Sequence, residues 1–261
     1  DRAGGAGFSG AAAQAARRAY TLSPDDLEAC LLWAQVNYRM IFIMQQQQQE
    51  QQRDQLIEIL GQLIQEMQED FPDEDTYLPL MVARLIQQEK NEEAGNAIRT
   101  WVNSDRALSE STLMQFANFA DRFELMAVEP ILQRLEADHG MTPRLALRLA
   151  MQALRDEQPA EQVLREFDAR RQASDAGEPL QWDLLRAQLA MAESPEESAR
   201  HWIAMINQYE DSVQALRLGI DNLIRIDLLK HRETIDQAIR RLRALTTDDG
   251  VAWRMARAQW N

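Results

Sequence analysis

The feature that most constrains the fold is a pair of helical patterns that recurs along most of the chain. Each pair carries a closely packing residue where two helices would touch, at positions 34, 82, 117, 150, 187 and 219. These positions are separated by 48, 35, 33, 37 and 32 residues, so four of the five intervals scatter about a period of roughly 34 residues. Such a period is typical of helical hairpins that stack on their neighbours and bury a shared core.

The composition favours helices over strands. The 261 residues include 10 Gly and 8 Pro, and Leu, Ala, Gln, Glu and Arg, which are good helix formers, dominate the rest. Val and Ile are scattered and do not alternate with polar residues as they would in half-buried strands. We therefore predict an all-α protein.

Several helix starts are marked by capping residues. The stretch from Ser23 to Asp26 combines a hydroxyl, a proline and two early acids, which is the pattern of a helix N-terminus. Thr142 and Ser194 each precede a proline, and Ser109 precedes Glu110. These residues predict four helix boundaries.

The segment from Ala11 to Tyr38 is similar to a known repeat. Its first part, AAAQAARRAYTLSPDD, resembles the second helix and closing turn of a tetratricopeptide repeat, with Pro24 at the terminal proline. The following LEACLLWAQVNY resembles the next first helix, with Ala34 as its small residue. The resemblance extends over nearly the whole chain and implies a right-handed α-solenoid of about six antiparallel helix pairs. Another α-solenoid or a compact helical bundle would show a related pattern.

The pattern also predicts a domain organisation. Residues 1–10 are Gly-rich and are expected to form a flexible lead-in, and residues 11–261 a single helical-repeat domain. Residues 45–53 form a Gln-rich insertion, which accounts for the interval of 48 residues. We interpret it as extra turns that lengthen one hairpin; a disordered tip or a partner contact are the alternatives. The chain opens within one motif and closes within another, so we expect a fragment of a longer protein.

The charge argues against nucleic acid as a partner. The formal net charge is −14, whereas a nucleic-acid binder needs a basic surface that displaces counterions from phosphates. The charge is uneven: residues 45–100 contain twelve acids and four bases, and residues 225–261 contain five acids and eight bases. The acidic part could steer a basic partner. No apolar run is long enough to span a membrane.

No motif with catalytic or metal-binding spacing is found in the sequence. The three histidines, His139, His201 and His231, are far apart, and the pattern His-Glu-x-x-His is absent. Cys30 has no nearby histidine, and no phosphate-binding loop or nucleophile elbow occurs. We therefore expect no enzyme activity, no cofactor and no metal.

The tetratricopeptide resemblance implies a binding surface on the first helix of each pair, where the family lines its concave groove. Transferring those positions by alignment predicts a largely apolar, partner-binding strip. Its members are Leu31, Gln35, Tyr38, Met114, Asn118, Leu147, Met151, Leu184, Gln188, Met191, Leu216 and Ile220. If the alignment slips, these residues belong to the core instead; a second copy of the chain, or part of the same protein, could also fill the groove.

These observations predict a non-enzymatic protein–protein interaction scaffold that binds a helical or extended partner segment. Self-association through the groove or through the ends of the chain is a second kind of contact to expect. The main alternative is an interaction or regulatory appendage of an enzyme or transcriptional regulator encoded outside this chain. An α/α-toroid hydrolase is a more distant alternative, because such folds need clustered acids and aromatic residues at one end.

Overall fold

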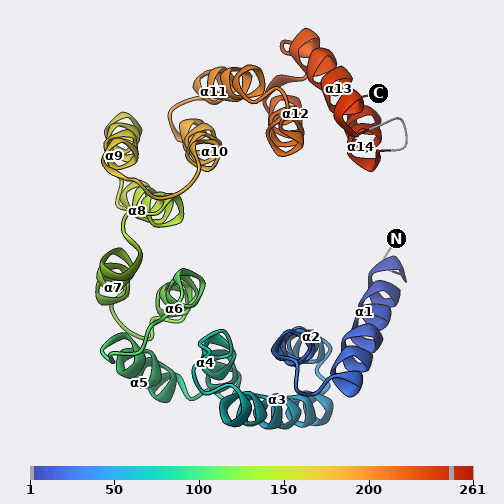
Figure 1. The fold of residues 1–261 in the computed structure, drawn as a ribbon, viewed down its shortest axis with the longest axis vertical. Helices are drawn as coiled ribbons and strands as arrows, with labels where there is room; N and C mark the ends of the chain where they lie inside the picture. The colour runs from blue at the N-terminus through green and yellow to red at the C-terminus, as the bar shows by residue number, and fades with distance from the viewer. Residues whose placement is uncertain (1–2, 247–249, 261) are drawn as a thin grey trace. The chain divides into compact units, whose positions relative to one another are not determined.

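The computed structural model describes the backbone of residues 3–246 and 250–260, and within them it is all-helical (Figure 1). This confirms the expected all-α class. The α-helices are α1 (Ala3–Leu22), α2 (Leu27–Gln46), α3 (Glu50–Asp70), α4 (Leu78–Gln87), α5 (Asn91–Val102), α6 (Glu110–Arg122), α7 (Glu129–His139), α8 (Pro143–Arg155), α9 (Ala160–Ala173), α10 (Pro179–Leu189), α11 (Pro195–Gln208), α12 (Val213–Asp227), α13 (Arg232–Thr246) and α14 (Val251–Trp260). A short 3₁₀ helix, η1 (Ala190–Ala192), joins α10 to α11.

The chain divides into two compact units, and within each unit the helices that follow one another in sequence pack against each other. Unit 1 comprises residues 1–139 and unit 2 comprises residues 140–261. The sequence pattern suggested one continuous repeat domain. Repeats of this kind contact only their immediate neighbours, so a continuous pattern is compatible with more than one compact unit.

Unit 1 consists of two layers of helices preceded by α1. Helices α2, α4 and α6 pack side by side in the first layer, and α3, α5 and α7 lie behind them in the second (Figure 1). Large apolar side chains fill the space between the layers, among them the fully buried Ile41, Leu60 and Phe116. Helix α1 packs on α2, and its Tyr20 hydroxyl donates a hydrogen bond of 2.6 Å to Glu66 of α3.

Unit 2 is likewise built from helices that pack on their neighbours in sequence. Helix α10 packs against α8, α9 and α11, and α12 packs against α11, α13 and α14. One apolar cluster surrounds Trp202 and a second surrounds Phe167, whose ring meets that of Trp182 edge-on at 5.3 Å. Gly219 lies against Ile206, and a Cβ atom at position 219 would be 2.5 Å from Ile206 Cγ1. The small residue therefore allows α12 and α11 to approach closely.

Four turns between paired helices share one geometry that sequence reasoning did not find. Gln48, Glu89, Glu124 and Glu157 all adopt positive φ angles, between 51° and 60°, directly after α2, α4, α6 and α8. In each case the next residue donates its backbone N–H to a carbonyl five residues earlier, as in the Schellman ending of a helix. A glutamine or glutamate occupies the position that glycine usually takes. This recurrence is independent support for repeated helix pairs.

The hairpin of α2 and α3 is the longest pair in the described part of the chain. Helix α2 has 20 residues and α3 has 21, whereas α4 has 10 and α5 has 12. The Gln-rich residues 45–53 form the end of α2, the turn and the start of α3, and most of them are exposed. The insertion therefore coincides with a lengthened helical hairpin.

At the N-terminal end of unit 1, helix α1 begins at Ala3, so the backbone of residues 3–10 is helical. The expected flexibility of the Gly-rich lead-in stays a prediction. Glycine in a helix costs about 1 kcal/mol relative to alanine. Adding residues to an existing helix gains one hydrogen bond each, so the alanine-rich stretch that follows can extend backwards through the glycines.

Three of the expected caps are present: Ser109, Thr142 and Ser194 each accept a hydrogen bond from a backbone N–H in the first turn of the helix that follows. At the stretch from Ser23 to Asp26 the cap is Asp26 and not the hydroxyl of Ser23, so α2 begins at Leu27. Ser212 caps α12 in the same way. Each such bond satisfies one of the free N–H groups at a helix N-terminus.

Candidate functional site

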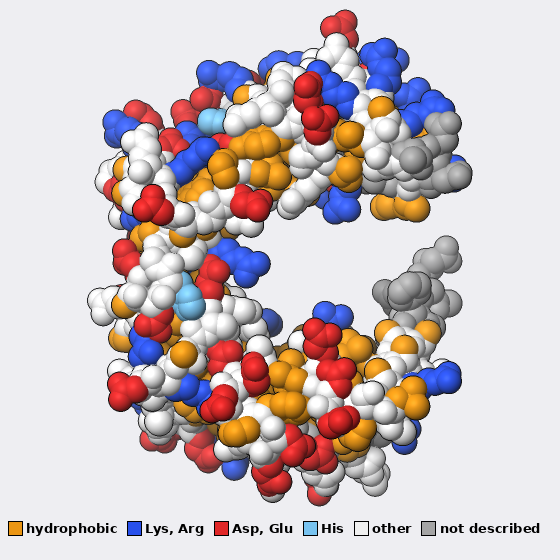
Figure 2. Space-filling view, in the orientation of Figure 1, with side chains coloured by type: hydrophobic (Ala, Val, Ile, Leu, Met, Phe, Trp, Pro, Cys, Tyr) orange, Lys and Arg blue, Asp and Glu red, His pale blue; other side chains and the backbone are white. Residues whose placement is uncertain are grey.

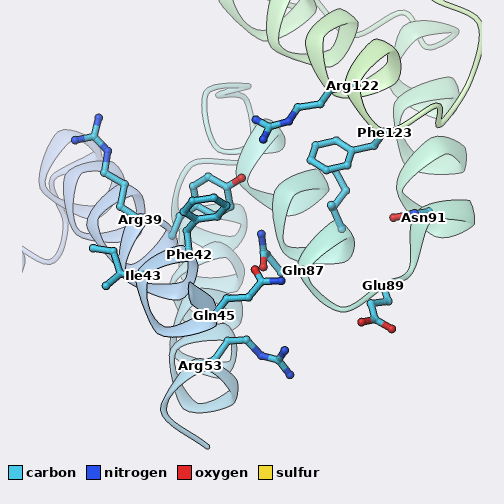
Figure 3. Close-up of a pocket in the computed structure, with 12 residues that line it drawn as sticks. Arg39, Phe42, Ile43, Gln45, Arg53, Gln87, Glu89, Asn91, Arg122 and Phe123 are labelled. Carbon is cyan, nitrogen blue, oxygen red and sulfur yellow. The ribbon is translucent and has the colours of Figure 1, made fainter. Parts of the chain in front are cut away.

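The candidate site is a pocket of about 650 Å³ in unit 1. It lies where the C-terminal ends of the three first-layer helices, α2, α4 and α6, come together (Figure 3). This volume is within the usual range for pockets that bind small molecules or single side chains of a partner. All of its lining residues belong to unit 1.

A mismatch in helix length creates the pocket. At 1.5 Å per residue, the 20 residues of α2 span about 30 Å, whereas the 10 residues of α4 span about 15 Å. The pocket residues of α2 run from Tyr38 to Gln45, in its C-terminal half, and those of α4 are its last two residues, Ile86 and Gln87. Helix α2 therefore continues past the end of α4, and this extension has no first-layer neighbour to cover it.

The pocket walls are aromatic. Phe42 is 49% exposed, although it belongs to a helix whose other face is buried, and Tyr38 is half-buried beside it. Phe123 faces them from the end of α6, where its ring lies 6.3 Å from that of Phe119. Figure 2 shows apolar side chains between α2 and α4 on the face of unit 1 that it draws. Contiguous exposed apolar surface generally marks a place where another molecule binds.

Three arginines surround the aromatic walls. Arg39 projects from α2 and is exposed, and no ion pair holds it within the described part of the chain. Arg122 reaches over from α6, with its guanidinium 5.3 Å from the centre of the Phe123 ring (Figure 3). Arg53 forms a salt bridge of 2.8 Å with Asp54, and this contact raises the pKa of the guanidinium. Arg53 therefore already has a carboxylate partner, unlike Arg39 and Arg122 among the described residues.

The C-termini of three helices and one carboxylate contribute negative charge to the floor and edge of the pocket. The last carbonyls of α2, α4 and α6 carry the partial negative charge of their helices, which favours cations nearby. Glu89, in its left-handed turn after α4, contributes a full negative charge at the pocket edge. The site can thus accept cationic or N–H groups near its floor and anionic groups at Arg39 and Arg122.

The predicted strip falls partly on this face of unit 1. Tyr38 lines the pocket, and Gln35 and Leu31 lie one and two turns earlier on the same side of α2, exposed and half-buried respectively. Met114 and Asn118 of α6 are half-buried and exposed. All five side chains are at least partly accessible, as the groove hypothesis requires, while their role in binding stays a prediction.

In unit 2 four of the predicted residues are accessible. Met151 is 47% exposed and Met191 is 45% exposed. Gln188 is exposed and Leu147 is half-buried. Figure 2 shows a second group of apolar side chains over α10 and α12 of this unit.

The remaining three predicted residues, Leu184, Leu216 and Ile220, are a correction. Leu216 and Ile220 are completely buried and Leu184 is 6% exposed, all within the core cluster of unit 2. In α12 the contact residue Gly219 faces α11, and residues one turn before and one residue after it share that buried face. The alignment was therefore out of register here, and a partner cannot reach these side chains while the helices remain packed.

Sequence reasoning did not select several residues that form the pocket, including Phe42, Arg39 and Arg122. The signal that could have found them is the interval of 48 residues. An insertion within one hairpin lengthens both of its helices, and the apolar residues next to it, here Ile41 to Met44, then extend past a shorter neighbour. One of these, Ile41, is buried, whereas Phe42 is left half exposed.

Other chemistry has little support in the described part of the chain. No group of three or more His, Cys, Asp or Glu side chains there is close enough to hold a metal ion. Cys30 is buried, its thiol donates a 3.2 Å hydrogen bond to the Pro24 carbonyl, and burial raises its pKa, which disfavours the reactive thiolate. None of the described helices is both long and apolar enough to cross a bilayer.

Comparisons of this chain with protein-family models, with curated proteins and with solved structures find no match. The tetratricopeptide resemblance therefore depends on the helix pattern, the small contact residues and the recurring turns. What these establish directly is an all-helical protein whose successive helices pack in neighbouring pairs.

Proposed function

We propose that this chain is a non-enzymatic protein-interaction scaffold that binds a segment of a partner protein on the first-layer helices. The observation that carries the proposal is the open aromatic pocket of unit 1, at which Phe42 stays half exposed. Aromatic and arginine side chains are the residue types most enriched among binding hot spots, and Tyr38, Phe42 and Arg122 lie together here.

We further infer that the pairs α2–α3, α4–α5, α6–α7, α8–α9, α10–α11 and α12–α13 are six tetratricopeptide-like repeats of a right-handed α-solenoid. The shared Schellman turns after the first helix of the first four pairs support this assignment. Repeats of this kind use the exposed side of their first helices for helical or extended segments of other proteins. The accessible Gln35, Asn118 and Gln188 could hydrogen-bond to such a segment.

Amide hydrogen exchange with selected peptides tests this function. A library of short random peptides would be selected against the whole chain, and exchange would be measured with and without the bound peptide. We expect slower exchange in α2, α4 and α6 and unchanged exchange in α3, α5 and α7, because only the first layer carries the open surface. Failure to select any specific peptide, or protection confined to the second layer, would refute the scaffold proposal.

A further inference from the structure

We infer that the unit 1 pocket selects an acidic partner segment that carries one bulky apolar side chain. The apolar side chain would sit between Tyr38, Phe42 and Phe123, and carboxylates on either side of it would pair with Arg39 and Arg122. The inference rests on the proposed scaffold function and adds the chemistry of the partner.

The apolar part of the inference follows from size and exposure. The pocket holds about 650 Å³ and opens to solvent, and one of its aromatic walls, Phe42, is 49% exposed. Burying an exposed aromatic ring against a partner removes apolar surface from water, which favours binding. A single leucine, methionine or aromatic side chain of a partner is the kind of anchor that fills such a space.

The preference for acidic side chains in the partner follows from which arginines of the pocket lack an ion pair in the described part of the chain. Arg53 already forms an ion pair with Asp54, which a partner carboxylate would have to replace. Arg39 and Arg122 have no ion pair within the described residues, and they project from opposite sides of the pocket, α2 and α6. Guanidinium groups bind carboxylates through two parallel hydrogen bonds, so each is suited to one acidic side chain of the partner.

Arg122 is also held in position. Its guanidinium lies over the Phe123 ring, 5.3 Å from the ring centre, so it is directed across the pocket before a partner arrives. A side chain that is already ordered loses less entropy on binding. The side-chain amides of Gln45 and Gln87, which also line the pocket, can donate to and accept from an extended backbone between the two acids.

A nucleic acid fits this surface less well, although arginine and aromatic residues together can also bind single strands. Binding a phosphate backbone needs a row of cations. Here two uncompensated arginines stand near Glu89 and three helix C-termini, in a chain of net charge −14. An acidic peptide needs only the local pair of arginines, so the observations favour it.

The test uses the random-peptide library selected against the whole chain, with blocked synthetic peptides of the enriched sequences for affinity measurement by fluorescence anisotropy. We expect enriched peptides to place Asp or Glu beside a Leu, Met, Phe or Trp residue. The double variant Arg39→Glu/Arg122→Glu and the variant Phe42→Ser should each weaken binding at least about tenfold, the effect of losing a hot spot.

Matched controls come from exposed residues of unit 2. Arg217→Glu repeats the charge reversal on α12, and Leu229→Ser repeats the loss of an exposed apolar side chain, at a residue that is 81% exposed. Both should leave binding unchanged, and circular dichroism should show that all variants stay helical. With the double charge reversal, a library selection should now favour Lys and Arg beside the apolar residue.

Three results would overturn the inference, and they separate it from the scaffold proposal. Enriched peptides that are neutral or basic, yet lose binding on Phe42→Ser, would refute the acidic partner while leaving a scaffold in place. If no substitution in the pocket changes the affinity of the enriched peptides, they bind elsewhere on the chain. A single-stranded oligonucleotide that binds more tightly than any peptide, and is released by Phe42→Ser, would replace the protein partner with a nucleic acid.

Discussion

Helix α2 in unit 1 and helix α12 in unit 2 are both first helices of a pair, but their surroundings differ. On α2 the residues from Tyr38 to Gln45 line an open pocket, whereas α12 packs against α11, α13 and α14. Phe42 is half exposed on α2, and Leu216 and Ile220 are completely buried on α12. An apolar residue on a first helix becomes available for binding where it faces away from the adjacent helices, as Phe42 does, and joins the core where it faces them, as Leu216 and Ile41 do.

This comparison also explains why the Gln-rich insertion matters. Residues 45–53 carry no aromatic side chain and are mostly exposed. Their effect is indirect, because the longer hairpin carries Arg39, Phe42 and Arg53 to the wall of the pocket. Four predictions test the contrast between the units, from the largest expected effect to the smallest.

The largest effect is expected from truncating the buried side chains of unit 2. Leu216→Ala should lower the free energy of unfolding by about 2–5 kcal/mol, because it leaves a cavity in the core around Trp202. Met151→Ala, at a predicted binding residue that is 47% exposed, should change it by about 0.5 kcal/mol or less. Urea denaturation followed by circular dichroism measures both. Equal losses would show that exposure does not separate these positions.

Two glycines give effects of opposite sign in the two units. Gly219→Ala should destabilise by about 1–3 kcal/mol, because the new methyl group would meet the buried Ile206 side chain. Gly10→Ala in α1, with no atom within 4 Å of the new methyl group, should stabilise by about 1 kcal/mol through helix propensity. Thermal denaturation of the two variants measures both changes. A neutral Gly219→Ala would mean that α11 and α12 can move apart freely.

The recurring turns should behave alike in both units. Glu124→Gly in unit 1 and Glu157→Gly in unit 2 should each stabilise by about 0.5–1 kcal/mol, because glycine adopts a positive φ without the steric cost of a Cβ atom. Gly140→Ala, at a φ of 70°, provides the reverse change and should destabilise. If Glu124→Gly lowers the stability, the glutamate side chain makes a contact that stabilises the fold by more than its positive φ angle costs.

The smallest effect is expected from two tyrosine–carboxylate contacts, one in each unit. The hydrogen bond to Glu66 raises the pKa of Tyr20 to about 12, and burial together with Asp183 raises that of Tyr209 to about 12. Because both pKa values lie above the ordinary 10.0, the stability contributed by each contact is complete below pH 10 and is lost as the pH rises through 12. Ultraviolet titration should show two late-ionising tyrosines.

The variants Tyr20→Phe and Tyr209→Phe assign these ionisations. Each should remove one late phase and leave the other in place, because the two contacts lie in different units. Both tyrosines are partly accessible, so solvent weakens the contacts and stability below pH 10 should change little. Loss of an ordinary ionisation near pH 10, with both late phases kept, would show that the hydrogen bond of the substituted tyrosine does not form.

Much of the local structure could be predicted from the residues alone. The caps at Ser109, Thr142 and Ser194 form as expected, and Cys30 is buried as a small core residue. These outcomes depend on a few neighbouring residues, whose hydrogen bonds and apolar spacing act over one or two helical turns. The positive φ angles at Glu124 and Glu157 could not be predicted in this way, because glutamate rarely occupies that conformation.

The sequence by itself determined that this protein is helical, where the helices after Ser109, Thr142 and Ser194 begin, and that one hairpin carries an insertion. Only the tertiary structure decided which apolar residues are buried. Leu216 and Phe42 look alike as apolar residues on first helices, yet one is 0% exposed and the other 49%. The physical reason is that burial depends on which face of a helix its neighbours cover, and helix periodicity in one segment carries no information about where the other helices pack.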